Sequence, residues 1–110
     1  EHGRENLVEG KIEEGKVYIV VEDLISTGIS STSTINAVRE KNGIVGHCIA
    51  IFTYELEKAS QNFEAANVQL LTLTNFTSLV KIALKQKYIA KEQLTHIMDW
   101  KRHPEGWVAV

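Results

Sequence analysis

The stretch that decides the fold is Val17–Ser31, which reads VYIVVEDLISTGISS. It opens with five consecutive apolar residues, Val17–Val21, rather than with alternating apolar and polar ones. A continuous apolar run is typical of a strand that is covered on both faces, and such strands belong mostly to parallel sheets. We therefore expect a buried parallel strand that stops where Glu22 and Asp23 begin.

The two acids are followed by a hydroxyl-rich turn around Gly28, at the expected start of a helix. Ligands of parallel α/β sheets bind beyond the carboxyl ends of the strands. The free N–H groups and the positive dipole end of a helix N-terminus favour a phosphate. Buried carboxylates are costly unless something pairs with them, and a sugar diol or a metal-bound water would do so. The pattern predicts a site that holds ribose hydroxyls on the acids and a 5′-phosphate on the turn.

Helix capping is the simpler explanation of the turn. One hydroxyl is enough to cap a helix, and it contributes about 1 kcal/mol. This turn offers four hydroxyls around its glycine, from Ser26, Thr27, Ser30 and Ser31. Together with the preceding acids, this excess favours phosphate binding over capping.

The sequence VVEDLISTG, Val20–Gly28, closely resembles the phosphoribosyl diphosphate (PRPP) signature of the type I phosphoribosyltransferases. In that signature, hydrophobic residues, two adjacent acids and a Thr/Ser-Gly turn occur in this order. Within the family, the wording EDLISTG and the later AIFTYEL, Ala50–Leu56, resemble the orotate phosphoribosyltransferases of Gram-positive bacteria. The resemblance runs over nearly the whole chain, from His2 to Trp107.

The resemblance implies a three-layer α/β, Rossmann-like type I phosphoribosyltransferase fold, seen here as a partial parallel sheet with flanking helices. Residues 1–110 would be the C-terminal part of a single domain, without its N-terminal part and the hood over the base. The catalytic lysine of the family's mobile loop would lie just before residue 1. We expect a fragment that binds PRPP weakly and turns over nothing, whereas the complete protein would be a homodimer.

The reaction that the resemblance implies is transfer of the phosphoribosyl group from PRPP to orotate, giving orotidine 5′-monophosphate and diphosphate with Mg²⁺ as cofactor. Glu22 and Asp23 would be the catalytic residues and would hold the ribose hydroxyls, directly or through magnesium-bound water; no residue is expected to be a certain direct metal ligand. The residues expected to bind substrate are His2, which would help cover the diphosphate, together with Glu22, Asp23, Leu24, Ile25, Ser26, Thr27, Gly28, Ile29 and Ser30.

Other functions remain open at this point. Many orotate enzymes place an arginine near the end of the second strand, where this chain has Thr53 and Tyr54, so another base is an alternative. A non-catalytic PRPP-sensing regulatory domain is a second, although no basic DNA-binding face is visible. A phosphate-loop NTPase is disfavoured, because no Gly-x-x-x-x-Gly-Lys-Ser/Thr string exists. A response-regulator-like domain with incidental acids is the blandest reading.

Composition sets broad limits on the function. The chain has 110 residues, a formal net charge of −2 and a sequence pI near 6.1, which give no general electrostatic reason to bind nucleic acid or an anionic membrane. No apolar run is long enough to span a membrane and no secretory leader is visible, so we expect a cytoplasmic location. The single cysteine, Cys48, cannot form an intrachain disulfide and is expected to be a small buried hydrophobe.

The rest of the chain alternates between strand-like and helix-like segments, as a parallel sheet with right-handed crossovers requires. Helices are expected at about 29–41, from Leu56, after a Thr74 or Asn75 cap, and at 91–102; strands are expected at 44–53 and 68–73. The first helix should end at Asn42-Gly43 and bury Ser31, Thr34, Ile35 and Val38, with Arg39, Glu40 and Lys41 outside. The last should bury Leu94, Ile97 and Met98, with Trp100 and Trp107 as anchors.

Overall fold

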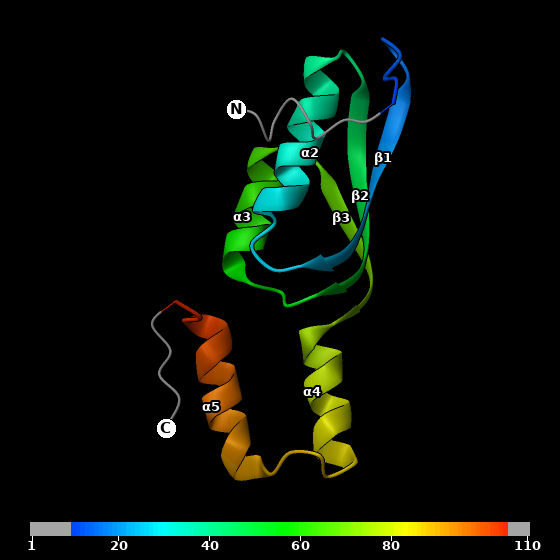
Figure 1. The fold of residues 1–110 in the computed structure, drawn as a ribbon. Coiled ribbons are helices and arrows are strands. Elements are labelled where there is room, and N and C mark those ends of the chain that lie inside the picture. Colours follow the sequence, from blue (N-terminus) through cyan, green and yellow to red (C-terminus); the bar gives the residue numbers. More distant parts are fainter. Residues whose placement is uncertain (1–9, 106–110) are drawn as a thin grey trace.

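The computed structural model describes residues 10–105, so His2 and Trp107 lie outside the described residues. The elements, in chain order, are β1 (Val17–Ile25), α2 (Ile29–Glu40), β2 (Ile44–Thr53), α3 (Glu57–Ala65), β3 (Gln69–Asn75), α4 (Phe76–Lys85) and α5 (Lys91–Arg102) (Figure 1). This order confirms the predicted alternation of strands and helices.

The three strands form one parallel sheet in the order β1-β2-β3. Val20 of β1 lies opposite Cys48 of β2, which in turn lies opposite Leu70 of β3. The prediction that β1 stops before Glu22 was wrong, because the strand continues through the acids to Ile25, which pairs with Thr53. The acids therefore lie within the strand and not after its end.

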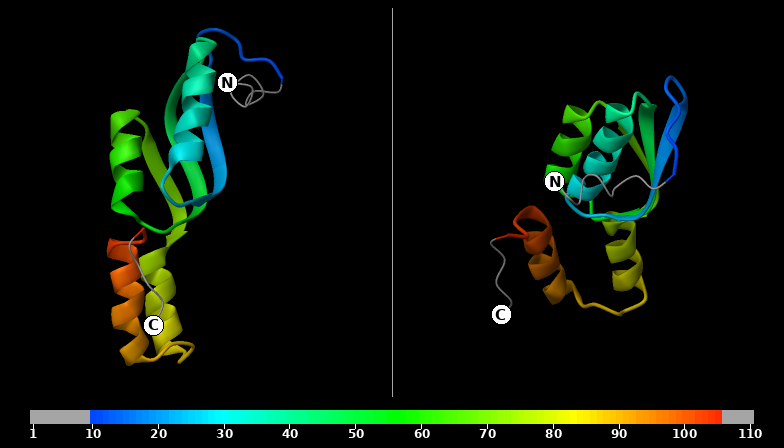
Figure 2. Two further views of the ribbon diagram at one scale, coloured as in Figure 1. Left: turned by 60° about the vertical axis from the view of Figure 1, so that its left-hand side comes forward. Right: turned by 45° about the horizontal axis from the view of Figure 1, so that its top comes forward.

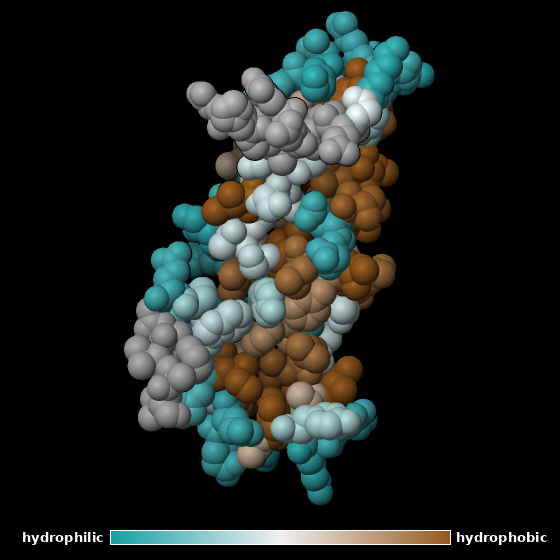
Figure 3. All heavy atoms as spheres, viewed as in Figure 1, coloured by the Kyte–Doolittle hydropathy of each residue, from teal (hydrophilic) through white to brown (hydrophobic). Residues whose placement is uncertain are grey.

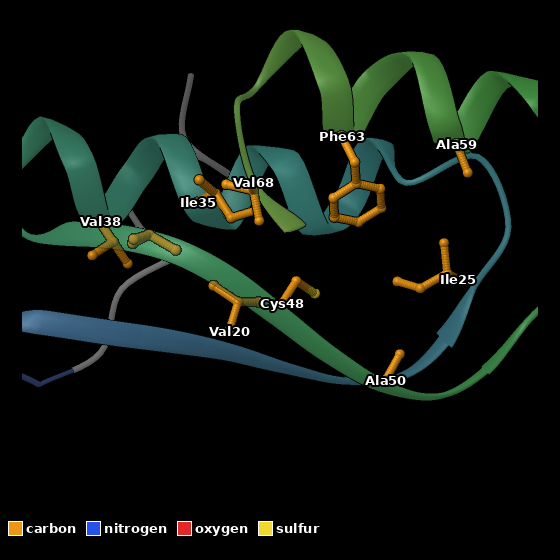
Figure 4. Packing of buried hydrophobic residues seen from close by; sticks show 10 residues of the cluster. Val20, Ile25, Ile35, Val38, Cys48, Ala50, Ala59, Phe63 and Val68 are labelled. Carbon is orange, nitrogen blue, oxygen red and sulfur yellow. The ribbon is translucent and has the colours of Figure 1, made fainter. Parts of the chain in front are cut away.

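Helices α2 and α3 cover one face of the sheet (Figures 1 and 2). The core lies between these helices and the sheet, and Figure 4 shows its side chains pointing toward one another. On the opposite face, Val17, Ile19 and Val21 are exposed, so within residues 10–105 the expected burial of β1 on both faces is not met. The buried core cluster consists of Val20, Ile25, Ile35, Val38, Val45, Cys48, Ala50, Ala59, Phe63 and Val68.

Helix α2 ends at Glu40, one residue earlier than predicted. The residue with a left-handed conformation after the helix is not the expected glycine. Asn42 adopts the left-handed conformation, with φ 66°, and Gly43 does not. The Gly43 amide donates to the Val38 carbonyl oxygen at 3.1 Å, which ties the turn back to the last turn of the helix. A Cβ atom at Gly43 would lie 2.6 Å from Val38 Cγ1, so glycine is needed here for close approach.

Replacing Gly43 by alanine is therefore expected to lower the free energy of unfolding by about 1–3 kcal/mol, the usual cost of overpacking. The added methyl group would also lie 3.1 Å from both Ile12 and Tyr18, so neighbours on two sides restrict its relief. Urea unfolding followed by circular dichroism measures the change. Gly46→Ala is the matched control, because a Cβ atom there meets nothing within 4 Å. Equal stability of the two variants would contradict the packing argument.

Arg39 was predicted to lie outside, and this prediction was wrong. Its guanidinium is half-buried between α2, α3 and the sheet, where Nη1 donates to the Ala66 carbonyl oxygen at 2.6 Å and Nη2 to the Val45 carbonyl oxygen at 2.7 Å. Carbonyl groups at a helix end lack partners within the helix, and a cation satisfies them well. Arg39 thus joins the C-terminal end of α3 to β2. The other inward residues of α2 are as predicted, with Ser31, Ile35 and Val38 buried and Thr34 half-buried.

Helices α4 and α5 extend beyond the carboxyl edge of the sheet as a pair (Figures 1 and 2). Asn75 caps α4 as predicted, since its side chain accepts a hydrogen bond from the Ser78 amide at 2.9 Å. Trp100 of α5 is an anchor, as predicted, because its ring lies 5.4 Å from that of Tyr54 and 5.6 Å from that of Phe76. The bounds of α5 are confirmed.

The predicted burial of the apolar side chains of α5 is not confirmed. No residue of α5 is buried, and its apolar side chains Leu94, Ile97 and Met98 are only half-buried, because within residues 10–105 the helix packs mainly through Trp100. Among the described helices, none is long and apolar enough to cross a membrane.

Candidate functional site

The turn Ser26–Gly28 joins the end of β1 to the start of α2, and the protein holds its Thr27 and Gly28 carbonyl groups. Asn62 Nδ2 of α3 donates to the Thr27 carbonyl oxygen at 2.8 Å. The Gly28 carbonyl oxygen accepts from both the amide and the hydroxyl of Thr32, each at 2.9 Å. The turn is therefore fixed through its acceptors, which leaves its donors for another partner.

The N–H groups of this turn have almost no partners within the described residues. None of the amides of Ser26, Thr27 and Gly28 donates to another group, and the Ile29 amide reaches only the Thr27 hydroxyl, at 3.5 Å. The Ser30 amide belongs to the first turn of α2, where helices have no internal acceptor. The side chains of Ser26 and Ser30 are exposed, and α2 has no side-chain cap. Simple capping thus does not account for the hydroxyls, and successive free amides are the arrangement that binds phosphate.

Gly28 has two reasons to be glycine. It adopts φ 81°, a left-handed conformation that other residues adopt only with strain. A Cβ atom there would also lie 2.9 Å from Phe63 Cε2, a buried ring of the core. Glycine is therefore required here both for its conformation and for the close packing of the turn against α3.

The two acids are adjacent in β1 and differ in burial. Glu22 is half-buried and shares the helix-covered face with Val20, whereas Asp23 is exposed. The charge of Glu22 contributes to the raised pKa of the Cys48 thiol, which lies on that face. Both acids precede the turn by only a few residues.

Cys48 is buried and free, as predicted. Burial raises the pKa of its thiol, the nearby Glu22 carboxylate raises it further, and a hydrogen bond with the Ser31 side chain acts in the opposite direction. A thiol in this environment stays protonated and is a poor nucleophile. It contributes packing beneath Glu22 rather than chemistry.

The end of β2 lies beside the turn, as predicted for neighbouring strands. The Tyr54 amide donates to the Ile25 carbonyl oxygen at 3.1 Å, which joins the two strand ends. Glu55 accepts from the amide and hydroxyl of Thr77, at 2.8 and 2.6 Å, at the start of α4. Burial would raise the pKa of Glu55, but these hydrogen bonds and the charge of Lys101 outweigh it, so the pKa is lowered. Glu55 therefore positions α4.

A groove of about 880 Å³ lies between the turn and the last turn of α5. Ser26 and Thr27 form part of one wall, and Lys101 and Arg102 form part of the other. Its charged lining is mixed, because Glu57, Asp99 and Glu105 accompany Lys58, Lys101 and Arg102. The groove gives a ligand at the turn access to solvent, whereas its balanced charge gives no added preference for an anion.

The predicted site residues divide into two groups in the structure. Ser26, Thr27, Gly28, Ile29 and Ser30 form one continuous turn at the helix start, with Glu22 and Asp23 upstream. Ile25 is buried, at 1% exposure, so its side chain belongs to the core, and the side chain of Leu24 is exposed. Sequence reasoning missed Asn62, which fixes the turn from 35 residues away, and no local signal could have found it.

Within residues 10–105, no group of three or more His, Cys, Asp or Glu side chains could hold a metal ion. Two carboxylates, Glu22 and Asp23, are too few to form a closed protein cage. Magnesium commonly keeps several waters and is bound through one or two carboxylates plus substrate phosphates. The residues present fit a magnesium ion of that kind, held mainly by substrate oxygens and reached by one carboxylate through water.

The sequence is similar to that of known proteins. The chain is 44% identical over 109 residues to an orotate phosphoribosyltransferase of Lactococcus lactis subsp. cremoris, covering 99% of this chain and 52% of that protein. It is 42% identical over 107 residues to an orotate phosphoribosyltransferase of Listeria monocytogenes, covering 97% of this chain and 51% of that protein. The chain spans about half the length of the curated relatives it matches, in their C-terminal half. No protein-family model matches the chain.

Solved structures show the same arrangement of strands and helices. The orotate phosphoribosyltransferase of Aeropyrum pernix aligns with a TM-score of 0.58 at 21% identity, over 68% of this chain and 40% of that one. The chain has part of the type I phosphoribosyltransferase fold. An adenine phosphoribosyltransferase from Thermoanaerobacter pseudethanolicus also aligns, with a TM-score of 0.53 at 22% identity over 57% of this chain and 36% of that one. The phosphoribosyltransferase fold is thus shared by neighbours that are named for different bases.

Proposed function

We propose that the turn 26–30 and the acids Glu22 and Asp23 bind the ribose 5-phosphate part of PRPP. In a full-length protein that contains this chain, the phosphoribosyl group would be transferred to orotate. The observation that carries the proposal is the row of turn amides without partners among residues 10–105, in a turn in which the protein already satisfies the Thr27 and Gly28 carbonyl groups. The similarity to relatives named orotate phosphoribosyltransferase supports orotate as the acceptor.

In this reaction a nitrogen of orotate forms a bond to C1 of the ribose while the bond from C1 to the diphosphate oxygen breaks. The electron pair of that bond leaves with the diphosphate, and the products are orotidine 5′-monophosphate and diphosphate. Positive charge develops on the ribose ring in the transition state. Catalysis therefore depends on positioning the sugar and on stabilising charge rather than on a protein nucleophile.

Each group of the site has a distinct task in this proposal. The amides of Ser26, Thr27 and Gly28 would hold the 5′-phosphate and so fix one end of the sugar. The carboxylates of Glu22 and Asp23 would hold the ribose hydroxyls, and their charge favours the developing cation. Bound Mg²⁺ would neutralise charge on the diphosphate. His2 would help cover the diphosphate.

The proposal also includes several properties that the described residues do not show. We propose that residues 1–110 form the C-terminal part of one phosphoribosyltransferase domain, that the full-length protein is a cytoplasmic homodimer, and that its small-molecule partners are PRPP and orotate, with no nucleic acid or membrane. The name of the matched relatives and the one-sided sheet support the first of these.

Two other functions compete with orotate transfer. A phosphoribosyltransferase for another base is favoured by Thr53 and Tyr54, which stand where many orotate enzymes have an arginine, and by the adenine-named neighbour. A non-catalytic PRPP sensor would use the same turn and acids without an acceptor site. The acceptor base distinguishes these possibilities.

A substrate panel tests the acceptor directly. The full-length protein that contains this chain is expected to release diphosphate from PRPP with orotate, and at least about 10²-fold more slowly with uracil, hypoxanthine or adenine, because a site built to pair with a polar group strongly rejects bases that lack it. Diphosphate release measured with a coupled assay gives the rates. Preference for a purine would contradict the orotate proposal, and PRPP binding without turnover of any base would favour the sensor.

A further inference from the structure

Asn62 of α3 makes a hydrogen bond that sets the direction of one peptide group in the turn. Its Nδ2 atom donates to the Thr27 carbonyl oxygen at 2.8 Å, and among residues 10–105 no other group donates to that oxygen. The peptide bond between Thr27 and Gly28 is trans, so its C=O and N–H groups point in opposite directions. Because the carbonyl group points toward α3, the N–H group of Gly28 points away from α3.

The glycine that the turn requires also makes this peptide group easy to reverse. Reversal of the central peptide group interconverts type I and type II turns, and glycine accepts φ of either sign, whereas it has φ 81° here. Phe63 and Ala59 of α3 pack against Gly28, but they make no hydrogen bond with the turn. Within the described part of the chain, the hydrogen bond from Asn62 therefore holds the observed orientation.

The next peptide group does not depend on α3. The carbonyl oxygen of Gly28 accepts from both the amide and the hydroxyl of Thr32, each at 2.9 Å, so α2 itself holds the peptide group between Gly28 and Ile29. The turn therefore has two consecutive peptide groups that are fixed by different helices. Only the first of them relies on a side chain that lies 35 residues away in the sequence.

The two orientations of the first peptide group have opposite effects on an anion. In the observed orientation, the N–H group of Gly28 has no partner within residues 10–105. Reversal would replace this donor by a carbonyl oxygen, whose partial negative charge repels a phosphate. In Figure 3 pale side chains of intermediate hydropathy gather around the start of α2, where Figure 1 draws the turn, so apolar side chains do not cover this part of the surface.

We propose that Asn62 is a positioning residue for the 5′-phosphate. By holding the Thr27 carbonyl group against α3, it keeps the N–H group of Gly28 directed away from the core and available to the anion. Asn62 would act through the turn and not by contact with the substrate. This inference rests on the proposed function for the identity of the anion, whereas the direction of the N–H group can be measured without any ligand.

The substitution Asn62→Asp tests the inference, because it inverts the hydrogen-bonding character of the side chain at nearly unchanged size. A carboxylate only accepts hydrogen bonds, so it repels the Thr27 carbonyl oxygen and favours the reversed peptide group, whose N–H can donate to it. In the full-length protein that contains this chain, affinity for ribose 5-phosphate is expected to fall at least about tenfold, which is the usual contribution of a hydrogen bond to a charged group. Calorimetry measures the affinity, and residual dipolar couplings of the Gly28 N–H bond, without ligand, measure its direction.

Gln61→Glu is the matched control, because it adds the same charge one residue earlier on α3. Gln61 is exposed and lines the groove beside Ser26 and Thr27, and its side chain makes no hydrogen bond within residues 10–105. This variant is expected to change the affinity less than about twofold, since solvent and salt screen an exposed charge. Asn62→Leu removes the donor without adding charge and should also weaken binding and change the direction of the N–H bond. Melting temperatures show whether each variant folds.

The outcomes distinguish this inference from the proposed function. Weaker binding together with a changed direction of the Gly28 N–H bond would support the role of Asn62. An unchanged direction in both Asn62 variants would overturn it whatever the affinity, and so would an equal loss of affinity in Gln61→Glu. If Asn62→Asp does not fold, Asn62→Leu decides the question by the same two measurements. An unsubstituted protein that binds no ribose 5-phosphate would contradict the proposed function and with it the phosphate role of Asn62, whereas equal binding with and without Asn62 would contradict only this inference.

Discussion

Replacing Glu22 by glutamine together with Asp23 by asparagine is expected to lower the rate of phosphoribosyl transfer by at least about 10³-fold, since removal of one preorganised electrostatic group commonly costs about 10²–10³. Both changes keep the side-chain shape and remove the negative charge that favours the cationic ribose. The measurement uses a chimera in which this chain replaces the C-terminal half of the Lactococcus lactis relative, with orotidine 5′-monophosphate formation as the readout.

The single variants Glu22→Gln and Asp23→Asn measure the contribution of each acid separately. Glu22 is half-buried near Cys48, whereas Asp23 is exposed, so the two carboxylates are expected to contribute unequally. Glu14→Gln provides the control, because Glu14 is an exposed acid at the opposite end of β1. Turnover close to that of the control in the double variant would remove the acids from the site. An unchanged melting temperature shows that the loss lies in function and not in folding.

The second large effect is expected for Gly28→Val. The substitution forces a β-branched residue into φ 81° and drives its Cβ atom toward Phe63, at 2.9 Å. Backbone strain and overpacking each cost about 1–3 kcal/mol, so the free energy of unfolding should fall strongly. The start of α2 would shift with the turn, and affinity for ribose 5-phosphate should be lost. Urea unfolding and calorimetry measure the two effects.

Two further variants separate strain from contact. Gly15 has φ 80° and nothing within 4 Å of a Cβ atom, so Gly15→Ala measures the conformational strain alone. Gly28→Ala is expected to lower the free energy of unfolding more than Gly15→Ala does, because only the first substitution also creates the close contact with Phe63. Adding Phe63→Leu should recover part of that difference. Ribose 5-phosphate binding that survives Gly28→Val would show that the phosphate does not depend on this turn.

Most of the fold could be predicted because its signals are local. The apolar runs of β1 and β2, the spacing of Ser31, Ile35 and Val38, and the cap at Asn75 are each visible within a few residues of sequence. Arg39 could not be placed in this way, since its partners are carbonyl groups of Val45, Ala66 and Asn67 that become neighbours only after folding. A charged residue near a helix end has the same local appearance whether it faces solvent or caps a neighbour.

The candidate site was predicted as a list of residues and not as a geometry. The acids, the hydroxyls and the glycine could be named because their order alone resembles a PRPP signature. The location of both acids inside the strand depends on β1 continuing to Ile25, and strand pairing with β2 determines that length. Asn62 reaches the turn only because α3 packs beside it.

The sequence by itself determined the alternation of strands and helices, the parallel sheet and the hydroxyl-rich turn, because apolar periodicity and turn chemistry act over short distances. Only the tertiary structure decided that, within residues 10–105, the amides of Ser26, Thr27 and Gly28 have no partner and that Val17, Ile19 and Val21 are exposed on one face of the sheet. The physical reason is that pairing, alternation and burial depend on which distant segments meet, and an apolar residue carries no mark of the partner that covers it.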